Sequence, residues 1–139
     1  MVPVVLFSRE WFNEFENALN TSPEYQRTAE TWEGDIILAM RGDGKSSVMK
    51  LGSSLYVFLG LSHGKCTGIS VSDAIPERQH EYLLEGNASV WEAIISGKGD
   101  LVNSVLKGEV KVAGSIPKLM KYLPAAQALI ASARSVRTL

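Results

Sequence analysis

The sequence has few of the residues that usually carry chemistry. It contains one cysteine, Cys66, and two histidines, His63 and His80, among 139 residues. A single cysteine excludes an intrachain disulfide, so nothing in the composition requires an oxidising compartment. The histidines have no neighbouring ligand at metal-binding spacing, and Cys66 is best interpreted as a packed strand residue. We therefore expect no metal, no cofactor and no catalytic centre.

Long apolar runs and a strong net charge are also lacking. No apolar stretch approaches the roughly 18–20 residues of a membrane-spanning helix, and the chain start lacks the features of a secretory signal. The net charge of −1 gives no attraction to polyanions, so no nucleic-acid partner is expected. Gly44-Lys45-Ser46 lacks the upstream glycine of a phosphate-binding loop. The length predicts one domain over 1–139, and we expect it in the cytoplasm.

Charge is distributed unevenly along the chain. Residues 1–100 carry 8 basic and 14 acidic side chains, a balance of −6, whereas residues 101–139 carry 6 basic side chains against Glu109, a balance of +5. One interpretation is a solvated helix face. The other is a basic C-terminal end, including Lys118 and Lys121, that meets an anionic membrane surface or an acidic headgroup.

Apolar spacing and capping residues predict six helices and five strands. Helices are expected at about 9–20, 23–29, 88–96, 101–106, 116–123 and 125–136, with Ser8, Ser22, Asn87 and Asp100 as N-caps. Strands are expected at 36–40, 55–61, 66–71, 82–84 and 110–112, with a hairpin turn over 62–65. This order indicates an α+β fold with two antiparallel, turn-linked pairings. The two-helix connection between the last two strands could form a parallel crossover.

The helices offer more apolar surface than one small sheet can cover. Strands 36–40 and 55–61 are apolar on both faces, and the last helix carries Ala125, Ala126 and Ala133. Alanine fills little space, so a helix packed through it can leave a cavity beneath. Such a cavity suits a lipid tail, at about 0.8 kcal/mol for each buried CH₂ group.

Two segments resemble one known family. The run Trp91-Glu92-Ala93-Ile94-Ile95-Ser96-Gly97-Lys98-Gly99-Asp100 is similar to a "W-x-x-[IL]-x-x-G-x-x-[DS]" helix segment of sterol carrier protein type 2-like domains. The run from Glu109 to Gly114, with Gly108 before it and Ser115 after, resembles the closing strand of that family, "G-x-[IL]-x-[VI]-x-G-[DS]". The order of elements agrees over about residues 8–137.

The resemblance implies a five-stranded, mostly antiparallel sheet covered by helices that enclose an apolar tunnel. It also implies non-enzymatic binding and transfer of a fatty acid, fatty acyl-CoA, sterol or phospholipid. Two alternatives stay open. The chain could be a structural module with a filled core that forms a homodimer, or an accessory domain that presents lipids to an enzyme partner.

Apolar helix faces supply the candidate ligand-binding residues, and Gln127 is the candidate partner of a headgroup. We expect the last helix to open and admit the lipid. The candidates are Trp91, Ile94, Ile95, Leu101, Val105, Leu106, Met120, Gln127, Leu129, Ile130 and Ala133.

Overall fold

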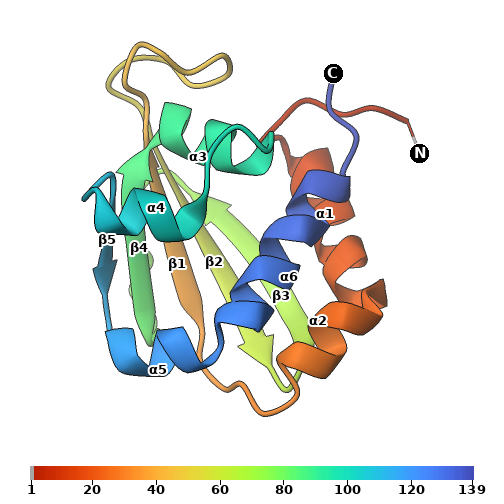
Figure 1. Ribbon diagram of the computed structural model, residues 1–139. Coiled ribbons are helices and arrows are strands. Elements are labelled where there is room, and N and C mark those ends of the chain that lie inside the picture. The colour runs from red at the N-terminus through yellow and green to blue at the C-terminus, as the bar shows by residue number, and fades with distance from the viewer. Residues whose placement is uncertain (1) are drawn as a thin grey trace.

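The computed structural model describes residues 2–139 and has the predicted order of elements (Figure 1). Two helices precede four strands, two more helices separate the fourth strand from the fifth, and two helices end the fold. The elements are α1 (Arg9–Thr21), α2 (Pro23–Thr28), β1 (Ile36–Arg41), β2 (Ser54–Ser62), β3 (Lys65–Ser72), β4 (Tyr82–Asn87), α3 (Ala88–Ile95), α4 (Leu101–Leu106), β5 (Val110–Ala113), α5 (Ile116–Lys121) and α6 (Leu123–Ser135).

The five strands form one mixed sheet in the order β3-β2-β1-β4-β5. The pairings β1–β2, β2–β3 and β4–β5 are antiparallel, and β1–β4 is parallel. The expected parallel crossover between the last two strands is therefore wrong. Helix α3 starts directly after β4, and β5 begins at Val110 opposite Gly86 near the end of β4. Because α3 and α4 stay at that end of the sheet, β5 runs back along β4.

The parallel pair arises from the segment between β3 and β4. Strand β3 ends beside Tyr56, the partner of Ala39, whereas β4 begins opposite Ile36 at the start of β1. Residues 73–81 must therefore travel back along the sheet. Arg78 from this segment places its guanidinium 3.6 Å from the ring centre of Phe58. Phe58 alternates with the helix-facing side chains of β2, so this contact covers the face that the helices leave free.

The helices lie on one face of the sheet (Figure 1). Helix α1 begins where the Ser8 hydroxyl accepts a hydrogen bond from Trp11 N at 3.2 Å, and Ser22 caps α2 in the same way. These two caps are confirmed. Asn87 occupies the N-cap position of α3, but its side chain makes no capping hydrogen bond, so that part of the prediction is wrong. No helix within residues 2–139 is both long and apolar enough to cross a bilayer.

The β2–β3 turn contacts the helical layer. His63 and Gly64 both have positive φ, at 49° and 76°, which gives the two-residue turn typical of a tight hairpin. A Cβ on Gly64 would lie 2.7 Å from the carbonyl oxygen of Gln26 in α2. Glycine is therefore needed here both for its backbone conformation and for the close approach to α2.

An aromatic cluster fills the core beneath α1. Trp11, Phe12, Phe15 and Leu19 lie on one face of the helix and are all buried. The Trp11 ring packs edge-on against Phe12 at 5.1 Å and lies 5.3 Å from Phe15, both measured between ring centres. This part of the molecule is filled by its own side chains.

Candidate apolar binding site

A cavity of about 240 Å³ lies between the helix-covered face of the sheet and the later helices. Every residue that lines it is apolar, and the lining comes from three strands, β1, β2 and β4, and from the four helices α3 to α6. The lining residues are Ile36, Leu38, Leu59, Leu84, Trp91, Leu101, Val102, Val105, Leu106, Ile116, Leu119, Met120, Leu123, Ala126, Leu129 and Ile130.

Strand alternation builds the floor of this cavity. Ile36 and Leu38 are two residues apart on β1 and therefore point to the same face. Leu59 of β2 is the register partner of Ile36, and Leu84 of β4 is the register partner of Leu38. Three neighbouring strands thus supply one continuous aliphatic surface.

Short, capped helices build the walls. The Asp100 carboxylate accepts a hydrogen bond from Asn103 N at 2.9 Å and starts α4, which confirms that predicted cap. The Ser115 hydroxyl accepts a hydrogen bond from Lys118 N at 3.3 Å and starts α5. Helix α6 carries Ala126 at the cavity, where the small side chain leaves space between the helix and the sheet.

Trp91 closes one side of the cavity with its indole ring. The side chain is buried, and its Nε1–H donates to the carbonyl oxygen of Ala39 at 3.1 Å. The polar atom of the ring is thereby satisfied by the sheet. The part of the indole ring that faces the cavity is therefore an apolar aromatic surface.

The structure brings most of the predicted binding residues together. Seven of them line the cavity: Trp91, Leu101, Val105, Leu106, Met120, Leu129 and Ile130. Ile94, Ile95 and Ala133 do not line it. Ile94 and Ala133 are buried where the second half of α6 meets α3, a junction at which Arg134 Nε donates to Ile94 O at 2.9 Å. Helical spacing placed these residues on an apolar face but could not tell which neighbour covers that face.

Gln127 lines a second, adjoining cavity of about 240 Å³. Asp100 and Arg134 contribute to its lining, and Leu101, Val102, Leu123, Ala126 and Ile130 are shared with the apolar cavity. Arg134 is held in place because its Nη2 also donates to Gly99 O at 3.2 Å. The apolar cavity therefore has a polar neighbour at α6.

Sequence reasoning missed the floor of the cavity. Ile36, Leu38, Leu59 and Leu84 were recognised as strand residues but not as candidates for a site. Both faces of these strands are apolar, so no alternation of apolar and polar residues marked the inward-facing set. Ala126 was noted only as a small residue, although it lies where the adjoining cavities meet.

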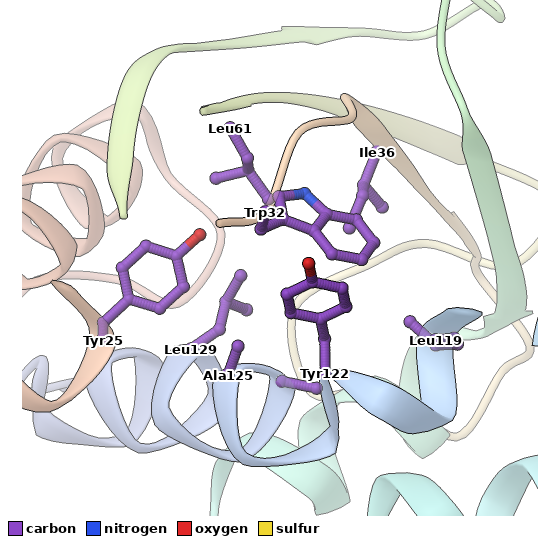
Figure 2. A pocket seen from close by; sticks show the side chains of 9 residues that line it. Tyr25, Trp32, Ile36, Leu61, Leu119, Tyr122, Ala125 and Leu129 are labelled. Carbon is purple, nitrogen blue, oxygen red and sulfur yellow. The ribbon is translucent and has the colours of Figure 1, made fainter. Parts of the chain in front are cut away.

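A third and smaller pocket, of about 30 Å³, adjoins the cavity and includes Tyr25 of α2 in its lining (Figure 2). Ile36, Leu119, Ala126 and Leu129 line both spaces. The remaining walls include three aromatic side chains, Tyr25, Trp32 and Tyr122. This pocket therefore lies next to the cavity and has a largely aromatic lining.

Polar bonds hold α5 against the rest of the fold. Lys118 Nζ pairs with Glu81 Oε1 at 2.6 Å and donates to Glu33 O at 3.0 Å. The Tyr122 hydroxyl, just after α5, donates to Thr31 O at 3.2 Å. Lys118 is thus engaged within the protein, whereas Lys121 is exposed.

Three apolar side chains of the lining reach solvent and form a rim. Leu106 at the end of α4 is 78% exposed, and Ile116 and Met120 of α5 are 43% and 53% exposed. Lys107 and Lys121 follow Leu106 and Met120 in the chain and are exposed beside them. The rim, Leu106, Ile116 and Met120, is apolar at its centre and bordered by positive charge.

The chemically reactive residues lie away from the cavity. Burial raises the pKa of the Cys66 thiol to about 11, so the thiol is neutral at physiological pH. The His63 ring pairs with Glu33 Oε1 at 2.6 Å and lies 3.0 Å from Glu30 O. Within residues 2–139, no cluster of three or more histidine, cysteine or acidic side chains could hold a metal ion.

Solved structures share this architecture over nearly the whole chain. A crystal structure of sterol carrier protein 2 has a TM-score of 0.82 and 30% identity, and the match covers 94% of this chain and 98% of the other. A conserved hypothetical protein from Thermus thermophilus, described as possibly a sterol carrier protein, has a TM-score of 0.82 and 28% identity over 100% and 94% of the two chains. The apo form of sterol carrier protein 2 from Yarrowia lipolytica shares the fold at a TM-score of 0.57 and 16% identity, over 89% of each chain. No protein-family model and no curated protein matches the sequence.

Proposed function

Because the chain belongs to the sterol carrier protein 2-like family, we propose that it binds a lipid in the apolar cavity and carries it unaltered. The observation that carries the proposal is an unfilled space of about 240 Å³ whose lining is entirely apolar. Apolar cavities of about 150 Å³ already take up benzene. Each CH₂ group transferred from water into this space contributes about 0.8 kcal/mol.

Binding without catalysis is supported by the chemistry of the lining. The cavity residues include no nucleophile, acid or base that could act on a bound lipid. The ligand class that fits is a fatty acid, a fatty acyl-CoA, a sterol or a phospholipid, with its aliphatic part in the cavity. The proposed lipid-binding domain spans residues 1–139.

Titration with a fluorescent fatty acid tests this proposal. Ala126→Phe places a ring at the meeting point of the adjoining spaces and should weaken binding at least tenfold, about 1.4 kcal/mol. Ala131→Phe adds the same ring to an exposed position of the same helix and serves as the control. Equal affinity of the two variants, or no saturable binding by the unmodified protein, would refute the proposal.

We further propose that the rim docks on an anionic membrane when lipid is exchanged. Leu106, Ile116 and Met120 combine exposed apolar area with direct access to the cavity, and Lys107 and Lys121 match an anionic surface. Helix α1 is unsuited to this role because its apolar face is buried and its remaining surface carries Glu10 and Glu14.

Co-sedimentation with vesicles tests the docking surface. Binding to vesicles that contain phosphatidylserine should exceed binding to pure phosphatidylcholine and should weaken as salt is raised. Leu106→Ser should reduce binding, whereas Leu51→Ser should not. Leu51 is 77% exposed, against 78% for Leu106, and does not line the cavity. Equal losses in both variants would contradict the assignment.

The same rim could instead bury itself against a second copy of the chain. Analytical ultracentrifugation separates the two possibilities. A dimer that Leu106→Ser converts to a monomer, without any change in vesicle binding, would favour the dimerisation module. If the protein is a monomer at all concentrations, the rim is not a dimer interface, and membrane docking is the favoured role.

A further inference from the structure

One hydroxyl that faces the small aromatic pocket of Figure 2 makes no hydrogen bond within residues 2–139. The pocket measures about 30 Å³, roughly the space of two water molecules or of one small functional group. Its aromatic walls come from α2, from the segment before β1 and from the α5–α6 junction (Figure 2).

Two of its three aromatic side chains have their polar atoms occupied. Trp32 Nε1 donates to Gly34 O at 2.8 Å. The Tyr122 hydroxyl is bonded to Thr31, 3.0 Å from Oγ1 and 3.2 Å from the carbonyl oxygen. Neither group has to be satisfied from the pocket.

Tyr25 differs from both. Only 2% of the residue is exposed, and its hydroxyl points into the pocket (Figure 2). Within residues 2–139 this hydroxyl has no hydrogen-bond partner. The hydroxyl oxygen is not sealed from the pocket, so water or a ligand group in the pocket can hydrogen-bond it. A ligand can therefore engage this hydroxyl without breaking a hydrogen bond within the protein.

A ligand in the main cavity can reach this hydroxyl. Ile36, Leu119 and Leu129 belong to the linings of both spaces, so the two spaces adjoin across these side chains. An interaction with Tyr25 requires that a chain in the apolar cavity passes between these shared side chains and places one of its ends beside this residue.

We propose that the bound lipid carries a neutral oxygen, a hydroxyl or a carbonyl, at its innermost end, and that the Tyr25 hydroxyl hydrogen-bonds it. This inference rests on the proposed function. A tyrosine hydroxyl both donates and accepts, so it suits either group.

The surroundings favour a neutral group over a charged one. No cationic side chain lines the pocket, and Lys118, which lies over the Trp32 ring at 4.8 Å from its centre, is paired with Glu81. An ionised carboxylate would lose its hydration without gaining a counter-ion. Burial also raises the pKa of the Tyr25 phenol above its usual value, so the phenol keeps the proton that it donates.

The test compares two ligands that differ only at one end, 1-tetradecanol and 1-chlorotetradecane. Both are measured by displacement of a fluorescent fatty acid from the full-length protein. Tyr25→Phe should weaken tetradecanol about 2- to 10-fold, the range of one hydrogen bond, and leave chlorotetradecane unchanged. Tyr122→Phe is the matched control, because its hydroxyl is already bonded to Thr31. It should leave the ratio of the two affinities unchanged.

Thermal unfolding supplies a second readout. Because Tyr25→Phe removes a hydroxyl that makes no hydrogen bond within residues 2–139, the ligand-free variant should be as stable as the unmodified protein or more stable. If Tyr25→Phe binds both ligands with the same ratio of tetradecanol to chlorotetradecane affinity as the unmodified protein, this inference is wrong. The proposal of a lipid carrier is not affected by that result. If the unmodified protein binds neither of these ligands nor the fatty acid, both the proposed carrier function and this inference are wrong.

Discussion

Helices α1 and α6 have the same length, 13 residues each, and both cover the sheet, yet they enclose different interiors. Helix α1 presents Trp11, Phe12 and Phe15, which fill the space beneath it. The first half of α6 presents Ala126, Leu129 and Ile130, and the space beneath it stays open. Aromatic side chains bury roughly 150–250 Å² each, far more than alanine. Side-chain volume, at the same helix length, separates a filled core from a binding cavity.

The largest expected difference between the two regions is in stability. Phe15→Ala should lower the free energy of unfolding by about 3–5 kcal/mol, because it opens a void in packed surroundings. Leu129→Ala should cost about 2 kcal/mol or less, because Leu129 already borders empty space. Urea denaturation of both variants checks this. Equal losses would mean that the region beneath α6 is packed as tightly as the region beneath α1.

A ligand should stabilise the open region selectively. A fatty acid at 100 times its dissociation constant should raise the free energy of unfolding by about 2.7 kcal/mol. The same ligand concentration should stabilise Ala126→Phe by about 1.4 kcal/mol or less, because binding at least tenfold weaker leaves the ligand at no more than about 10 times its dissociation constant. Urea denaturation with and without ligand measures both values. An equal gain in Ala126→Phe would place the ligand elsewhere.

The smallest expected effect concerns pH and belongs to the β2–β3 turn, outside the apolar cavity. Hydrogen bonding to the Glu30 carbonyl and to Glu33 raises the pKa of His63. The protonated ring therefore stabilises the folded state fully below the unfolded pKa of about 6.5, and this contribution is lost as pH rises through the folded value.

Comparison of the unmodified protein with His63→Asn measures this contribution, since asparagine tolerates the positive φ of the turn. The difference in stability between the two should shrink between pH 6 and pH 8. Tetradecanol affinity should not change over that interval, because no titratable group lines the apolar cavity. A pH-dependent affinity would contradict the independence of the cavity from this turn.

The sequence predicted the elements better than the spaces between them. Caps at Ser8, Ser22 and Asp100 follow from local hydrogen bonding, and the structure confirms them. The partner of each strand depends on the path of the connections. Residues 73–81, which carry no periodic signal, lead the chain back along the sheet and make β4 parallel to β1. The sequence instead suggested a parallel pair between the last two strands.

The same limit applies to the site. Periodicity marked the apolar faces of α3, α4 and α6, and seven predicted residues line the cavity. Whether an apolar residue borders empty space depends on its neighbours. Ile94 and Leu129 both lie on apolar helix faces in the sequence, but in the structure only Leu129 lines the cavity. The role inferred for Tyr25 follows from the lack of a hydrogen-bond partner for its hydroxyl, and this lack can be seen only in a structure.

The hydrogen bonds and ion pair of Lys118, Tyr122 and Arg134 affect the route by which a ligand can enter the cavity. They fasten both α5 and α6 to other parts of the protein, so lifting either helix would break several of them. Helix α4 is tied to α6 only before its start, where Arg134 donates to Gly99 O; within residues 2–139 its own residues make no such cross-link to α5 or α6, and the side chains that face the shared cavity are aliphatic. We therefore expect α4, rather than the C-terminal helix, to swing aside as the gate, with Leu106 at its moving tip.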